Sequence, residues 1–148
     1  MAHILLDSNV LIYMFDQGSR EKQSQAIQVI NALSLGGQGC LSIQCLAEFM
    51  SAATRRLRPA LPAAQALVEV ERFAQSFSVF DLSVPIGLEA ARGVRDHHLS
   101  YYDAQLWATA RLNQVPVIFT EDFSPGRVLE YVRYVNPFAS DFDLAQWA

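Results

Sequence analysis

The sequence is short of residues on which several kinds of protein depend. Among its 148 residues it has two cysteines, one lysine (Lys22) and no apolar run long enough to span a bilayer. Cys40 and Cys45 lack the accompanying histidines or further cysteines of a zinc site, so we expect buried, reduced thiols. The first residues lack the basic and apolar stretches of a secretory leader. These features predict a cytoplasmic protein with no membrane association.

Positive charge is also scarce, because 11 basic residues face 15 acidic ones and give a net charge of −4. Nucleic-acid-binding proteins usually carry a basic surface, so an RNA site here would need clustered arginines or bound divalent cations. Arg55, Arg56 and Arg58 form one cluster, which the preference of cations for helix C-termini also explains. Arg127, beside a predicted turn, is the better candidate for a phosphate contact.

Apolar residues are abundant, at 51% of the chain, and predict one domain over residues 1–148. Strands and helices alternate in the predicted order, which favours a parallel sheet covered on both faces. The predicted strands lie near 3–6, 39–42, 78–81, 115–119 and 132–135, and the predicted helices near 9–16, 20–34, 44–57, 62–76, 84–98 and 101–114.

Two carboxylates follow predicted strands. Asp7 comes directly after the apolar run that ends at Leu6, and Asp122 closely follows the strand that ends near Phe119. Ligands of open α/β sheets bind outside the carboxyl ends of the strands, so both acids are candidates for one site. The residue types leave alternatives open: Asp7 could cap the next helix, and Asp122 could initiate a turn with Gly126.

Two more carboxylates lie on predicted helices. Asp103 shares an apolar stripe with Leu106 and Trp107, where a carboxylate needs a metal ion, a hydrogen-bonding cap or a raised pKa. Ser100 and Asp103 also match the capping-box pattern, which is the alternative. Glu48 points away from the apolar stripe of its own helix, and periodicity alone would make it a solvated residue.

The chemistry that four converging acids offer is metal-assisted hydrolysis. Phosphodiester cleavage needs neutralisation of developing negative charge and a supply of hydroxide, and hard divalent ions held by carboxylates provide both. Phosphatases and receiver domains that use a strand-end aspartate also rely on a lysine near the phosphate. The single lysine, Lys22, lies in a polar early helix, and Asn9 stands where the phosphatase pattern has a second acid.

Several segments together resemble the PIN domains, and in particular the VapC-type toxins. Residues 6–13 (LDSNVLIY) are similar to the opening motif of that family, residues 46–49 to its second acidic position, and residues 99–104 to its third. Residues 120–123, Gly126 and residues 136–138 resemble the family's final part. The resemblance runs from residue 3 to residue 138 and leaves residues 139–148 as a C-terminal tail, in which Trp147 either docks on the body or belongs to a frayed end.

This resemblance implies a three-layer α/β/α sandwich with a central parallel sheet, and a Mg²⁺- or Mn²⁺-dependent endoribonuclease. Asp7 and Asp103 would be the main metal ligands. Glu48 and Asp122 would complete the catalytic cluster, Asp122 as a further metal ligand. The supporting positions are Ser8, where the family often has threonine, and Thr120, Glu121 and Arg127. Glu121 adjoins Asp122, so the sequence leaves open which of the two faces the metal.

The resemblance also implies partners. It predicts the toxin of a type II toxin–antitoxin pair: a homodimer that cleaves RNA and is neutralised by a cognate antitoxin protein, whose arginine would enter the acidic cluster. An intact cluster does not by itself prove turnover, so the alternative is a PIN-like RNA- or protein-binding module without catalysis.

Overall fold

The structure is a computed structural model and describes residues 2–124 and 126–148. Pro125, part of the turn predicted around Gly126, lies outside the described residues. The strands are β1 (Ile4–Leu6), β2 (Gly39–Ser42), β3 (Ser78–Phe80), β4 (Val117–Phe119), β5 (Val128–Leu129) and β6 (Val132–Val135). The helices are α1 (Ser8–Tyr13), α2 (Arg20–Gly36), α3 (Ile43–Arg55), α4 (Ala63–Ser76), α5 (Val84–His97), α6 (Tyr101–Leu112) and the 3₁₀ turn η1 (Leu144–Gln146).

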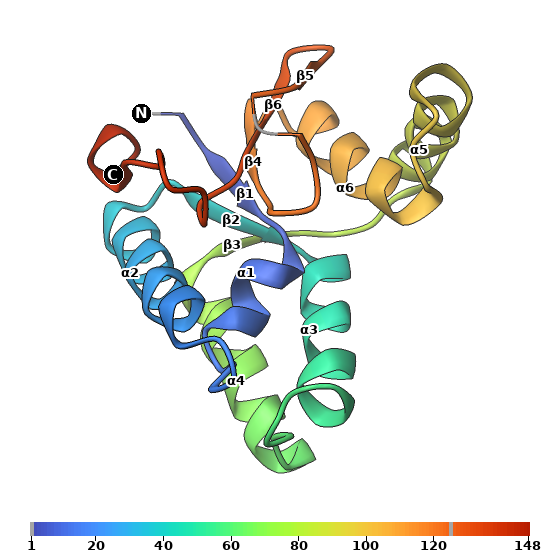
Figure 1. Ribbon diagram of the computed structural model, residues 1–148. Helices are drawn as coiled ribbons and strands as arrows, with labels where there is room; N and C mark the ends of the chain where they lie inside the picture. The colour runs from blue at the N-terminus through green and yellow to red at the C-terminus, as the bar shows by residue number, and fades with distance from the viewer. Residues whose placement is uncertain (1, 125) are drawn as a thin grey trace.

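One six-stranded sheet, in the order β3-β2-β1-β4-β6-β5, forms the middle of the molecule (Figure 1). The first five strands of that order are parallel, as predicted. The sixth, β5, pairs antiparallel with β6 and was not predicted. It has only two residues, and the turn that joins it to β6 places Glu130 and Tyr131 at positive φ without the asparagine or glycine that usually marks such a turn.

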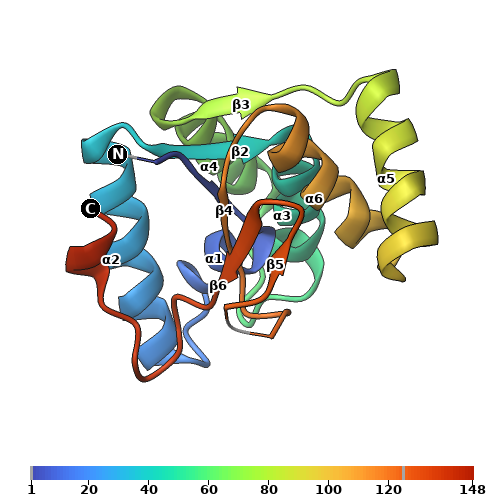
Figure 2. The same cartoon turned by 90° about the horizontal axis from the view of Figure 1, so that it is seen from above.

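Helices cover both faces of the sheet, which confirms the three-layer α/β/α sandwich (Figures 1 and 2). Strand side chains alternate between two buried cores: Ile4 and Leu6 face helices α1 to α4, whereas Leu5 faces α5 and α6. Trp107 is fully buried in the second core. The period-two alternation of β1 therefore fixes which face each residue of this short strand serves.

Helix α6 differs from the amphipathic helix that its periodicity predicts. Every residue from 104 to 110 is buried, because α5 and the sheet enclose the helix on all sides. Asp103 consequently lies not within a buried stripe but in the first turn, at the partly open end of α6. Small residues on α5 permit this packing: a Cβ at Gly93 would lie 2.9 Å from the Trp107 ring.

The C-terminal tail packs on the body of the molecule. The Trp147 ring meets Phe119 edge to face at 5.4 Å between centroids, and its backbone carbonyl accepts a hydrogen bond from Gln38. Docking, rather than fraying, is therefore the observed arrangement. Among the described residues no helix is long and apolar enough to cross a membrane, and both cysteines are buried and free.

Candidate metal centre

Three neighbouring strands of the sheet end at the same edge. Asp7 follows β1, Thr120 follows β4, and Ser42 ends β2 and caps α3 by accepting a hydrogen bond from the Cys45 amide. The Asp7 amide also donates to the Phe119 carbonyl at 3.0 Å, so β1 and β4 stay paired up to the point where the acid emerges. The fold thus brings together residues 113 positions apart in the sequence.

Asp7 is the most enclosed of the four predicted acids, with 7% of its surface exposed. One carboxylate oxygen, Oδ1, accepts a hydrogen bond from the Ser8 amide at 2.7 Å and caps α1, so the capping interpretation is also correct. The other oxygen, Oδ2, accepts from the Thr120 hydroxyl at 2.7 Å. Burial raises the pKa of Asp7 to about 6, and the charges of Glu48 and Asp122 add to the rise, while both hydrogen bonds oppose it.

Glu48 lies beside Asp7 and not in open solvent. Ligand atoms of Asp7, Cys45 and Glu48 lie within 4.8 Å of one another, and the Glu48 side chain is half-buried. Burial is the main cause that raises the pKa of Glu48; the charge of Asp103 raises it further, and that of Arg56 lowers it. The periodicity of α3 located its core face correctly, but the opposite face looks toward the sheet edge and α6.

Asp103 reaches the cluster from the first turn of α6. The Ser100 hydroxyl donates to Asp103 Oδ2 at 2.7 Å, and no side chain caps the backbone of this helix. The predicted capping box is therefore absent, because the serine hydroxyl bonds the carboxylate instead of an amide. The charge of Asp103 raises the pKa of Glu48, so the two acids act on one another's surroundings at the same site.

Asp122 lies at the exposed rim of the site. Its Oδ2 accepts a hydrogen bond from the Asn9 side-chain amide at 3.2 Å, and the same amide nitrogen donates to Thr120 Oγ1 at 3.1 Å. Asn9 thus links the acids that follow β1 and β4, a role that sequence reasoning missed although Asn9 lies two positions after Asp7. Its own oxygen, Oδ1, is buried and has no hydrogen-bond partner among the described residues.

Glu121 turns away from its neighbour. Its carboxylate accepts a short hydrogen bond from the Tyr13 hydroxyl and forms an ion pair with Lys22 at 2.9 Å. The lone lysine of the chain is thereby engaged by Glu121. Of the two adjacent acids, only Asp122 is placed where its charge acts on Asp7.

Arg127 is exposed just before β5, at the same end of the sheet. Burial raises the pKa of Tyr134, the charge of Asp103 raises it further, and the charge of Arg127 lowers it. Within the described ranges the Arg127 side chain makes no ion pair, unlike Arg92 or Arg111.

Two side-chain amides that sequence reasoning missed, those of Gln44 and Gln105, join α3 to α6 beside the site. Gln44 and Gln105 are both buried, and Gln105 Nε2 donates to Gln44 Oε1 at 2.9 Å. Gln44 Nε2 in turn donates to the Tyr102 carbonyl at 3.0 Å. These bonds hold α3 against α6 and fix the separation of Glu48 from Asp103; the i, i+4 spacing of Gln44 and Glu48 was the only available signal.

The residues present suit a hard divalent cation. Among the described residues no lysine or arginine forms an ion pair with any of the four acids, so their mutual repulsion is not offset by a pairing cation. The buried, unpartnered Asn9 Oδ1 adds a neutral oxygen at the site. Cys45 fits less well, because burial and the charge of Asp7 raise the pKa of its thiol and its Sγ donates to the Leu6 carbonyl. Oxygen donors of this kind are those that Mg²⁺ and Mn²⁺ prefer.

Solved structures of similar fold are toxins in complex or alone. A toxin–antitoxin complex from Klebsiella pneumoniae is 20% identical, with a TM-score of 0.67, over 90% of this chain and 97% of the other. DNA-bound VapBC from Salmonella typhimurium is 20% identical, with a TM-score of 0.66, over 93% and 99%. The Mycobacterium tuberculosis toxin VapC20, described as cleaving the sarcin–ricin loop, is 21% identical, with a TM-score of 0.64, over 88% and 98%.

No curated protein matches the sequence. The family model described as "PIN domain" matches residues 4–128, a range that includes β1, α3, α6 and β4 and therefore all four acids. Together with the parallel sheet and the acids at its carboxyl edge, that match establishes that the chain belongs to the PIN domain family.

Proposed function

We propose that the protein is a divalent-metal-dependent endoribonuclease that acts as the toxin of a type II toxin–antitoxin pair. The observation that carries this proposal is that four carboxylates lie at one edge of the sheet with no pairing cation among the described residues. Oxygens of two of them, Asp7 and Glu48, lie within 4.8 Å of each other, and burial raises the pKa of Asp7 to about 6. Keeping such a group in the fold is costly unless a cation binds it. The PIN family match and the toxins among similar structures support the same assignment.

We assign Asp7, Asp103 and Asp122 as ligands of Mg²⁺ or Mn²⁺, with Glu48 completing the cluster. A bound ion would supply charge neutralisation at the scissile phosphate and a water of lowered pKa. Thr120 and the Ser8 amide hold the Asp7 carboxylate in place through its two hydrogen bonds. The Ser8 side chain lowers the pKa of Glu48 and so favours its charged form, which would accept a proton from the attacking water.

Arg127 and Glu121 take supporting positions in this proposal. Arg127 is exposed and lies at the carboxylate end of the sheet, where a phosphate of the RNA strand can meet it. Glu121 acts at a distance: by binding Tyr13 and Lys22 it fixes the loop after β4 and so the position of Asp122.

We further propose a homodimer in the cytoplasm that is neutralised by an antitoxin protein. Support comes from the structures of similar fold, one of which is described as a toxin–antitoxin complex and another as DNA-bound VapBC. An antitoxin arginine can replace the missing cation at the cluster through bidentate bonds to its carboxylates.

Purified, partner-free protein should cut total cellular RNA into discrete fragments with Mg²⁺ or Mn²⁺, and not with EDTA. The Asp7→Asn variant should give no fragments, and Glu71→Gln, an exposed acid-to-amide change on α4, should behave as the unmodified protein. Binding of RNA by folded, metal-loaded protein without any cleavage would instead support a binding module without catalysis.

A further inference from the structure

An apolar recess adjoins the acidic cluster on the side away from Asp7. It has a volume of about 300 Å³ and is lined by Gln44, Ala47, Glu48, Leu82, Tyr102 and Gln105. Glu48 belongs to both the recess and the cluster, so anything that fills the recess lies next to the site of metal binding. Leu82 comes from the link between β3 and α5, which runs past α3 and α6 (Figure 2).

The walls of the recess are an exposed phenol ring and an exposed aliphatic side chain. Tyr102 is 66% exposed and Leu82 is 45% exposed, although both are large apolar side chains beside a polar site. The Tyr101 ring packs edge to face on Tyr102 with 5.4 Å between centroids, which restrains the second ring and leaves one of its faces open.

Two buried glutamines that line the recess are joined by a hydrogen bond. Gln44 uses its amide for bonds to Glu48, Tyr102 and Gln105, so its orientation is fixed before any ligand arrives. Gln105 Nε2 is used by Gln44, whereas its Oε1 accepts no hydrogen bond within the described part of the chain. Gln105 lines the same recess, and an amide oxygen there can accept a hydrogen bond from an exocyclic amino group or ring N–H.

We infer that this recess binds one unpaired base of the RNA strand, stacked on Tyr102 and adjacent to the scissile phosphate. The inference rests on the proposed endoribonuclease function and names the part of the substrate that would give it sequence preference. Proteins recognise single-stranded RNA by stacking splayed bases on aromatic rings and by bonding their edges. An apolar wall, an open ring face and one fixed acceptor beside an acidic metal site match those requirements.

The direct test measures stacking without cleavage. Short oligouridylates, each with 2-aminopurine at one position, are titrated with Asp7→Asn protein in Mg²⁺, and quenching of the 2-aminopurine fluorescence reports contact with an aromatic ring. Quenching should occur at one position with Tyr102 or Tyr102→Phe and be lost with Tyr102→Ala. Tyr131→Ala, an 89% exposed tyrosine on the β5–β6 turn, is the matched control and should leave quenching unchanged.

Kinetics separate this inference from the function on which it rests. If the protein cleaves RNA, Tyr102→Ala should raise KM about tenfold, in line with measured base-stacking energies, and change kcat little. Cleavage by the unmodified protein with equal quenching and equal KM for Tyr102→Ala would overturn the base recess and leave the nuclease standing. Position-specific quenching without any cleavage would support the base recess and contradict the proposed nuclease function.

A second copy of the chain is the competing occupant of this surface. The mass of the Tyr102→Ala protein, measured by light scattering, distinguishes an RNA base from a second copy as the occupant. A change of oligomeric state with unaltered quenching would assign Tyr102 to a protein interface and overturn the inference.

Discussion

Acidic residues occur in two dense groups, and the groups differ in what surrounds them. At the carboxyl edge of the sheet lie Asp7, Glu48, Asp103 and Asp122, none of which pairs with an arginine or lysine among the described residues. Oxygens of Asp7 and Glu48 lie within 4.8 Å of each other. On the other side of the fold, Glu89, Asp96 and Glu130 are each paired with cations. The comparison distinguishes acids that form ion pairs within the fold from acids that have no such partner, which we propose bind a metal ion.

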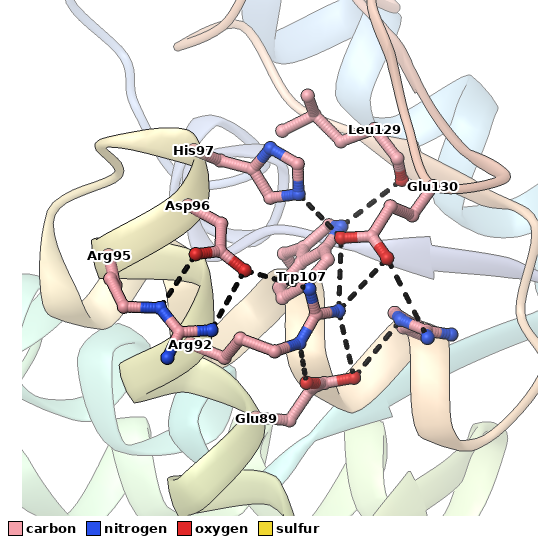
Figure 3. A network of polar contacts seen from close by, with 9 residues as sticks. Glu89, Arg92, Arg95, Asp96, His97, Trp107, Leu129 and Glu130 are labelled. Atoms are coloured by element: carbon pink, nitrogen blue, oxygen red, sulfur yellow. Dashed lines mark hydrogen bonds and ion pairs between the residues drawn. The ribbon is translucent and has the colours of Figure 1, made fainter.

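The paired group joins α5, α6 and the β5–β6 turn (Figure 3). Arg92 bonds Glu89, Asp96 and Glu130, and its guanidinium lies 5.4 Å from the centre of the Trp107 ring. Arg111 lies 3.0 Å from Glu89 and 3.7 Å from Glu130.

Titration reflects the difference between the groups. The Arg92 guanidinium and His97 lower the pKa of Glu130, and Arg95 above all lowers that of Asp96 to about 2, whereas Asp7 moves in the opposite direction. We therefore expect an added divalent cation to stabilise the unpaired group and not the paired one.

The largest expected effect is on catalysis. Asp7→Asn or Asp103→Asn should lower the rate of metal-dependent RNA cleavage by about 10³-fold or more, because each removes a charged ligand of an ion that contributes several kcal/mol at the transition state. Initial rates with Mn²⁺ in excess measure this, beside circular dichroism to show that the fold is kept. Activity equal to that of the unmodified protein in either variant would contradict the site assignment.

Glu48→Gln should reduce cleavage less, by about 10- to 100-fold, because the amide keeps one oxygen but loses the charge and the ability to accept a proton. Glu89→Gln in the paired group is the matched comparison and should leave the rate unchanged. Equal cleavage by the two variants would show that Glu48 has no role in catalysis.

Asp7→Asn should also stabilise the metal-free protein by about 1–3 kcal/mol at pH 7, because the pKa of Asp7 is raised in the folded state. The folded form then binds more protons than the unfolded form between about pH 6 and pH 4, so the stability of the unmodified protein rises as the pH falls through that range. Urea unfolding in EDTA at several pH values tests this. The difference in free energy of unfolding between the variant and the unmodified protein should disappear near pH 4. A difference that stays constant with pH would show that it does not come from the titration of Asp7.

The smallest expected effect has the opposite sign. Glu130→Gln should destabilise the protein by about 1 kcal/mol or less, since it removes partly exposed ion pairs with Arg92 and His97. The loss should shrink at high salt, where such pairs are screened. If Glu130→Gln stabilised the protein, the view that the paired acids stabilise the fold would be wrong.

The sequence predicted the elements well and the fold class correctly, because β1 and β2 each lead directly into a helix with a clear start and β4 is a short apolar run after the end of α6. It missed β5, whose two residues carry no periodic signal. It located α6 correctly but did not predict that every residue from 104 to 110 is buried, Gln105 and Thr109 included. Helical periodicity predicts which face of a helix is buried against the nearest core. It does not predict whether another element also covers the opposite face.

The same limit explains what was missed at the site. Asn9, Gln44 and Gln105 act through bonds to residues distant in the chain, such as Asn9 to Thr120 and Gln105 to Gln44. Amides of this kind have no spacing rule that would mark them. The roles of Asp7, Glu48, Asp103 and Asp122 in catalysis stay predictions until the variants are measured.

The pairing of β1 with β4 has a consequence for how the protein is made. Asp7 emerges from the ribosome early, but its strand lies between β2 and β4, and its hydrogen bond to Thr120 joins residues 113 positions apart. During synthesis a nascent chain that stops before β4 has one side of β1 open, its first acid unsupported and its cluster incomplete. The acidic edge of the sheet is therefore complete only after β4 has been synthesised and has paired with β1.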